Sequence, residues 1–297
     1  MKVTRASRVI SLFINSAVFG ALLFVLFVTS AAKGAELESR VAPFEGTTVH
    51  YQMSGKGADA LIFVHGWTCN ADFWRGQTSA FPNTRVIAVD LPGHGQSGKP
   101  QTDYTMDYFA RSIEAVMRHA QVKRAVLVGH SMGTPIVRQF YRLYPEKTLA
   151  LVIVDGALRL FMPKAQMDAF AAQLRANYKT AAPQMVEGML MPVKDEKMKS
   201  EIRAAMLGTP DYVAISAMTG MADEKVYAPD PIKVPVLAVL AKSPFWAADT
   251  EAFLRSLAPD LEFVMWDGVS HFLMMDKPQE FNRTLQAFLV KHKLLTH

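Results

Sequence analysis

Short apolar runs separated by polar and glycine-containing stretches recur along the chain from residue 60 onward. Two such runs, residues 60–64 (ALIFV) and 149–154 (LALVIV), contain no polar position, which is typical of parallel strands buried on both faces. Residues 47–52 (TTVHYQ) alternate instead and predict a strand. The same criteria predict further strands at residues 85–89, 125–128, 234–240 and 262–266.

Helical stretches such as residues 104–120 lie between the earlier predicted strands. Strands that alternate with helices form βαβ units, which place the strands parallel in one sheet with helices on both faces. The predicted fold class is therefore α/β, with a mostly parallel sheet.

The alternation of strands and helices stops between residues 158 and 230. This segment has no convincing strand, and several prolines punctuate its helical stretches. Nine of the 17 methionines of the chain fall in it. Because methionine fills irregular gaps and adapts to different ligands, we expect a helical cap with an apolar underside, inserted between the sixth and seventh strands. The main domain would then comprise residues 41–157 and 231–297.

The first 32 residues have the pattern of an export signal. Lys2, Arg5 and Arg8 precede an uncharged apolar stretch at residues 9–29, and the small residues 30–32 (SAA) suit a cleavage site. The apolar stretch is also long enough to cross a bilayer as a helix, so a signal peptide and an uncleaved membrane anchor are both open. In either case we expect a periplasmic or secreted protein that contacts a membrane only through this segment.

Composition narrows the range of partners. With 297 residues, half of them apolar, the chain can bury one substantial core. The formal charge of +5 falls to about +2 without the three basic leader residues, and no basic run is interleaved with aromatic residues. We therefore expect a small-molecule substrate and no nucleic acid. Cys69 is the single cysteine, which excludes an intrachain disulfide.

A serine stands in the sequence GHSMG at residues 129–133, directly after a predicted strand and before a helix-forming stretch. In this context the pattern G-x-S-x-G forms a nucleophile elbow. The turn strains the serine backbone, and the glycines let strand and helix approach closely. We expect Ser131 to be exposed at the carboxyl end of the strands, where the first amides of the helix can stabilise an oxyanion.

With this motif the chain resembles the α/β-hydrolase fold family, from about residue 41 to residue 289. FVHGW at residues 63–67, DLPGHGQS at 90–97 and DGVSHF at 267–272 resemble family segments independently. The resemblance implies that the backbone N–H groups of Trp67 and Met132 form an oxyanion hole. It also implies that the loop at 90–97 is structural.

A serine hydroxyl needs a base within hydrogen-bond reach. We expect His271 to be this base, because it lies in the turn between the last strand and the final helix and so faces the elbow across the sheet edge. A neutral imidazole there can accept the serine proton.

The carboxylate that orients the histidine is missing from its usual place in the family, where this chain has Ser243. Two aspartates can replace it. Asp155 ends a predicted strand and matches the position from which haloalkane dehalogenases and some lipases of the same fold supply their acid. Asp249 lies a few residues beyond the usual place. We favour Asp155 because a strand end positions a carboxylate more reproducibly than a loop, and Asp249 is the alternative.

These residues predict a serine hydrolase that forms an acyl-enzyme on an ester-type carbonyl. The alternatives are hydrolysis of a lactone, an amide or a carbon–carbon bond, acyl transfer to an alcohol, and, in another class, a ligand receptor that retains the triad. No metal or organic cofactor is expected, because the histidines and Cys69 lack metal-ligand spacing. A small to medium apolar substrate is expected to contact His130, Phe73, Trp74, Phe245 and Trp246.

Overall fold

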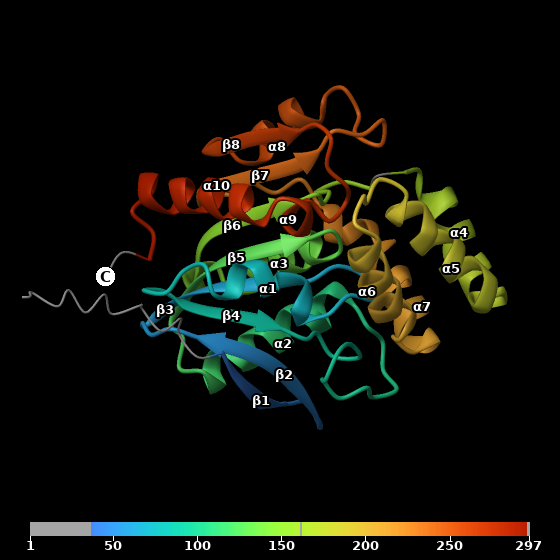
Figure 1. Cartoon of the computed structure of the whole chain (residues 1–297), viewed down its shortest axis with the longest axis horizontal. Helices are drawn as coiled ribbons and strands as arrows, with labels where there is room; N and C mark the ends of the chain where they lie inside the picture. The colour runs from blue at the N-terminus through green and yellow to red at the C-terminus, as the bar shows by residue number, and fades with distance from the viewer. Residues whose placement is uncertain (1–36, 161, 296–297) are drawn as a thin grey trace, which may run out of the picture. The chain divides into compact units, whose positions relative to one another are not determined.

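The computed structural model describes residues 37–160 and 162–295. A single eight-stranded sheet in the order β1-β2-β4-β3-β5-β6-β7-β8 runs through these residues (Figure 1). β2 pairs antiparallel with both β1 and β4, whereas every pairing from β4 through β3 to β8 is parallel. The predicted α/β class with a mostly parallel sheet is confirmed.

The elements follow one another in regular alternation through most of the chain. The strands are β1 (Glu38–Phe44), β2 (Thr47–Ser54), β3 (Asp59–Val64), β4 (Arg85–Val89), β5 (Arg124–His130), β6 (Thr148–Val154), β7 (Val236–Ala241) and β8 (Leu261–Trp266). The helices of the main domain are η1 (Ala71–Trp74), α1 (Arg75–Thr78), α2 (Met106–His119), α3 (Gly133–Leu143), η2 (Pro145–Lys147), α8 (Thr250–Leu257), α9 (Leu273–Asp276) and α10 (Pro278–Lys291).

Strand β1 was missed from the sequence, and the main domain accordingly begins before residue 41. β1 is an edge strand that buries only Ala42 and Phe44 and contains Pro43. A proline is tolerated at the edge of a sheet because one side of the strand needs no ladder hydrogen bonds. The apolar pattern of this strand is therefore too weak to be recognised.

Helices cover both faces of the sheet. α2 and α3 pack against each other on one face, and α1 and α10 lie on the other (Figure 1). α2 begins where the hydroxyl of Thr105 accepts a hydrogen bond from the amide of Tyr108, which satisfies one of the free N–H groups at the helix start. Because both faces are covered, the central strands β3, β5, β6 and β7 are almost entirely buried, as their continuous apolar runs require.

Four helices and a 3₁₀ turn lie between β6 and β7, beyond the carboxyl ends of the parallel strands (Figure 1). They are α4 (Lys164–Ala176), α5 (Tyr178–Leu190), α6 (Glu196–Leu207), α7 (Asp211–Met221) and η3 (Glu224–Tyr227). The indole N–H of Trp67 donates to the carbonyl oxygen of Ala214 in α7 at 2.8 Å, and the hydroxyl of Thr209 donates to the carbonyl oxygen of Thr68 at 3.1 Å. These bonds hold the helical segment, called the cap below, against the loop after β3.

The chain leaves the cap through a partly buried ionic contact. Arg138 and Arg142 of α3 both bind the carboxylate of Asp230, with N–O distances of 2.7 and 2.8 Å. Arg142 also donates to the carbonyl oxygen of Val226 at 2.6 Å. The return segment is thereby held on the same helix that follows the serine elbow.

The leader expected at residues 1–32 lies outside the described residues, so its cleavage and the export of the protein stay predictions. Within 37–160 and 162–295, no helix combines the length and the hydrophobicity that a membrane crossing demands.

The turn between β5 and α3 is packed too closely for a side chain at either of its glycines. A Cβ on Gly129 would lie 2.4 Å from the carbonyl oxygen of Gly133, and a Cβ on Gly133 would lie 2.4 Å from the carbonyl oxygen of Val64. Both contacts are with backbone atoms, which cannot move aside without shifting a strand or helix.

Replacement of Gly133 by alanine is expected to lower the free energy of unfolding by about 1–3 kcal/mol, because the added methyl group overpacks the turn. Urea denaturation measures this loss. The matched control is Gly188→Ala in α5, where a Cβ would meet nothing within 4 Å. That change should stabilise the helix by about 0.5–1 kcal/mol, and equal effects of the two substitutions would contradict the packing argument.

Candidate active site

Ser131 occupies the turn between β5 and α3 in a strained conformation. Its φ of 53° lies in the left-handed region, which is unfavourable for residues with a Cβ. The N–H of Ser131 donates to the carbonyl oxygen of Val154 at 3.0 Å, which fixes the turn to the end of the neighbouring strand β6. The surrounding backbone thus holds the serine in the conformation expected of an elbow.

His271 is held by a buried carboxylate. Its Nδ1 lies 2.6 Å from Oδ2 of Asp155, whose other oxygen accepts the N–H of Ala241 at 2.8 Å. Asp155 follows β6, is 7% exposed and has a φ of 43°. An ionised carboxylate only accepts hydrogen bonds, so this contact places a hydrogen on Nδ1, and a neutral ring then has its lone pair on Nε2.

Asp249, the alternative acid, lies elsewhere. Its carboxylate is exposed at the start of α8 and pairs with Arg159, 3.0 Å from Nη1. The hydrogen bond from Arg159 holds the pKa of Asp249 below its usual value. In the described part of the chain, the carboxylate bonded to the ring of His271 is that of Asp155.

His130 supports His271 from the other side. The Nε2 of His130 lies 2.8 Å from the carbonyl oxygen of His271, and the two rings are 4.7 Å apart between centroids. Burial lowers the pKa of His130 well below its usual value, so the ring is neutral, and a carbonyl partner assigns the proton to Nε2. The loop that carries His271 is therefore tied to the residue directly before Ser131.

Trp67 and Met132 line the same cavity as Ser131 and His271. Both residues lie outside helices and strands, and within the described ranges neither N–H has a hydrogen-bond acceptor. The hydroxyl of Ser131 likewise forms no hydrogen bond to a described residue. These donors are free to bind an oxygen atom of a ligand.

The cavity above these groups has a volume of about 610 Å³ and a mainly apolar wall. Phe245 and Trp246 border it from the main domain, and Lys242 is the one lysine or arginine among its described lining residues. The ammonium group of Lys242 lies 3.0 Å from Asp267. The cap contributes six methionines to the wall: Met162, Met185, Met189, Met206, Met218 and Met221.

Phe73 and Trp74 do not line this cavity, so the expectation that they contact a substrate is wrong. Trp74 is fully buried, with its ring 4.8 Å from that of Phe63. Phe73 is buried against Phe272, at 5.8 Å between ring centroids. Because η1 leads into α1 on the face of the sheet, its aromatic side chains turn into the core. Phe73 thus packs against Phe272, the residue next to His271, and supports that loop from the side of the core.

The sequence identified the cap as methionine-rich but not the individual residues that face the cavity. Met206 and Met218 belong to helices that pack against other helices as well as facing the cavity, so their apolar positions do not form one clean stripe. Tyr227 of η3 also borders the cavity and had no sequence signal. Among the described residues, no cluster of three or more histidine, cysteine or acidic side chains is placed to hold a metal ion.

A mostly parallel sheet that presents a strained serine and a carboxylate-bound histidine at its carboxyl edge, beneath a helical cap, defines the class of the α/β hydrolases. Comparison with known proteins leads to the same class: residues 59–190 match the family model described as alpha/beta hydrolase fold. The chain therefore has the α/β-hydrolase fold and resembles that family.

Two curated relatives illustrate the similarity. The chain is 26% identical over 252 residues to the dihydrolipoyllysine-residue acetyltransferase component of the acetoin cleaving system of Pseudomonas putida, covering 82% of this chain and 66% of that protein. It is 32% identical over 125 residues to a bifunctional esterase/perhydrolase of Acinetobacter calcoaceticus, covering 41% of this chain and 45% of that protein. The chain thus spans less than two thirds of the length of either relative.

A solved structure described as Est816, an N-acyl homoserine lactone degrading enzyme, matches over a longer range. The TM-score is 0.71 at 25% identity, with 84% of this chain and all of that chain covered.

Three fully buried histidines, His65, His94 and His130, lie around the site. Burial lowers the pKa of each below its usual value, and that of His94 falls to about 3. In the unfolded chain the same groups titrate near 6.5. Between these two values the unfolded chain binds more protons than the folded protein, so stability falls as the pH falls.

The free energy of unfolding is therefore expected to drop on acidification from about pH 7 to about pH 5, by about 2 kcal/mol for His94 alone. Urea denaturation at a series of pH values measures the change. Stability that stays constant across this range would show that these rings do not remain neutral in the folded protein.

Proposed function

We propose that the protein is a serine hydrolase that acts on an ester-type carbonyl through an acyl-enzyme. The observation that carries the proposal is the 2.6 Å contact between His271 and Asp155, made at the edge of the cavity that Ser131 also lines. This contact leaves Nε2 as the acceptor for the serine proton, which is the arrangement that an activated hydroxyl requires.

In the proposed reaction the hydroxyl oxygen of Ser131 attacks the carbonyl carbon, and its proton passes to Nε2 of His271. Asp155 stabilises the resulting imidazolium. The oxyanion accepts hydrogen bonds from the N–H groups of Trp67 and Met132. His271 returns the proton to the leaving group and then activates the water that hydrolyses the acyl-enzyme.

The cavity favours a neutral and largely apolar substrate. Its volume of about 610 Å³ is within the usual range for small-molecule sites, and its methionines can adapt to acyl or aryl groups of different shape. The cation at its wall, Lys242, is already paired with Asp267. A substrate with a free carboxylate would find little compensation for its desolvation.

Lactone hydrolysis is the second candidate. A lactone is a cyclic ester, so the same residues would serve, and the structure of the N-acyl homoserine lactone degrading enzyme resembles this chain over its full length. Epoxide opening and dehalogenation are disfavoured, because the elbow carries a serine and those reactions in this fold use an aspartate. Acyl transfer to an alcohol would be revealed by product analysis with added alcohol.

Ser131→Ala is expected to abolish release of nitrophenol from short acyl esters, because the nucleophile is lost. Asp155→Asn should lower kcat by about three to four powers of ten, since the imidazole then adopts the wrong tautomer. Asp249→Asn is the matched control, because its carboxylate pairs with Arg159. Steady-state kinetics on folded variants measures all three. A strong loss of kcat in Asp249→Asn with none in Asp155→Asn would show that Asp249, and not Asp155, is the acid that orients His271.

The rate should also depend on the acyl chain. We expect kcat/KM to rise from acetyl to hexanoyl nitrophenyl esters by up to about fourfold per CH₂ group, because each buried CH₂ contributes about 0.8 kcal/mol. A monosuccinyl ester, which is similar in length but anionic, should be a poor substrate. Preference for the anionic ester would contradict the neutral-substrate assignment.

A further inference from the structure

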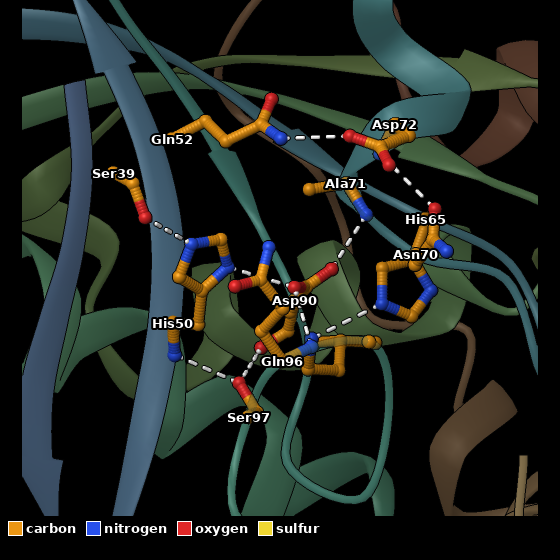
Figure 2. A network of polar contacts seen from close by, with 12 residues as sticks. Ser39, His50, Gln52, His65, Asn70, Ala71, Asp72, Asp90, Gln96 and Ser97 are labelled. Carbon is orange, nitrogen blue, oxygen red and sulfur yellow. Dashed lines mark hydrogen bonds and ion pairs between the residues drawn. The ribbon is translucent and has the colours of Figure 1, made fainter. Parts of the chain in front are cut away.

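A second hydrogen-bonded series of serine, histidine and aspartate lies where β1, β2 and the end of β4 meet (Figure 2). The hydroxyl oxygen of Ser39 is 2.8 Å from Nε2 of His50, and Nδ1 of His50 is 2.8 Å from Oδ2 of Asp90. Ser39 lies on the edge strand β1, His50 on β2, and Asp90 directly after β4. None of the three lines the cavity of Ser131.

The carboxylate of Asp90, at the end of this hydrogen-bonded series, is ionised and held by several donors. Burial by itself would raise the pKa of Asp90, but hydrogen bonds from His50 and from the backbone amides of Gln96 and Ala71 lower it below its usual value. Those amides lie 2.9 and 2.7 Å from its oxygens (Figure 2). The carboxylate can therefore only accept, so Nδ1 of His50 carries a hydrogen.

The remaining hydrogen bond joins Ser39 to the other ring nitrogen of His50. With the hydrogen on Nδ1, a neutral ring has its lone pair on Nε2, and the hydroxyl of Ser39 then donates to it. His50 is 2% exposed, whereas Ser39 is exposed to solvent. The result is an accessible hydroxyl that donates to a base oriented by a buried carboxylate, which is the arrangement that activates a serine nucleophile.

We propose that Ser39 is a second nucleophile, a covalent modification site that takes up acyl or phosphonyl groups from activated esters in solution. Its oxygen bonds to the electrophilic carbon or phosphorus atom while its proton passes to Nε2 of His50. The leaving group, a phenolate or fluoride, departs with its electron pair, and His50 then releases the proton. Asp90 stabilises the intermediate imidazolium.

Ser39 should react more slowly than Ser131. It lies on a paired edge strand, outside the cavity that Trp67 and Met132 line. Removal of such donors from an oxyanion hole costs about two to three powers of ten in rate. The acyl group on Ser39 should for the same reason be hydrolysed slowly and accumulate.

The test uses the full chain with Ser131→Ala and an alkyl fluorophosphonate, followed by intact mass and peptide mapping. We expect one adduct, on Ser39, that forms about two to three powers of ten more slowly than the adduct on Ser131 of the unmodified sequence. The additional substitution Ser39→Ala should remove it. Adding His50→Gln, which removes the base, should slow it at least tenfold.

Ser256 is the matched control within the same protein. It is exposed like Ser39, but its hydroxyl donates to the carbonyl oxygen of Phe253 at 2.7 Å and has no histidine partner. Labelling of Ser39 without labelling of Ser256 supports the proposal and does not require the His50 variant to fold. Equal labelling of the two serines, or none on Ser39 in folded protein, overturns it. Neither outcome depends on whether Ser131 reacts, so the two proposals fail separately.

Discussion

The close approach of α3 to strands β3 and β5 is the constraint on which the candidate site depends. Carbonyl oxygens occupy the positions where side chains at Gly129 and Gly133 would stand. With the glycines in place, the chain turns sharply enough to hold Ser131 at a positive φ, and the amide of Met132 has no acceptor among residues 37–160 and 162–295. The strain of one residue is thus maintained by the packing of three elements.

The imidazole opposite the serine is positioned by residues that are distant in sequence. Asp155 holds the ring of His271 from the end of β6, His130 holds its carbonyl oxygen from the end of β5, and Phe73 packs beneath the adjoining Phe272. These elements are neighbours only because the strands are parallel and end at one edge. Such an edge gathers polar side chains from several segments without any of them being close along the chain.

The cap is attached by hydrogen bonds and ion pairs to the same carboxyl edge of the sheet. Trp67, which lines the cavity, also donates its indole N–H to α7. The two arginines on α3 hold the segment that returns to β7. The wall of the cavity and the elbow are therefore attached to the same elements. A shift of the cap would therefore also move the backbone amides that are proposed to stabilise the oxyanion.

The sequence by itself predicted the parallel strands, the elbow around Ser131 and His271 as the candidate base, because continuous apolar strands and a turn motif are local patterns. It left Asp155 and Asp249 open, placed Phe73 and Trp74 in the pocket, and missed β1. The tertiary structure decided which carboxylate meets the imidazole, which aromatic side chains turn into the core, and which methionines face the cavity. Each of these depends on how elements pack against one another, and residue spacing along one element does not contain that information.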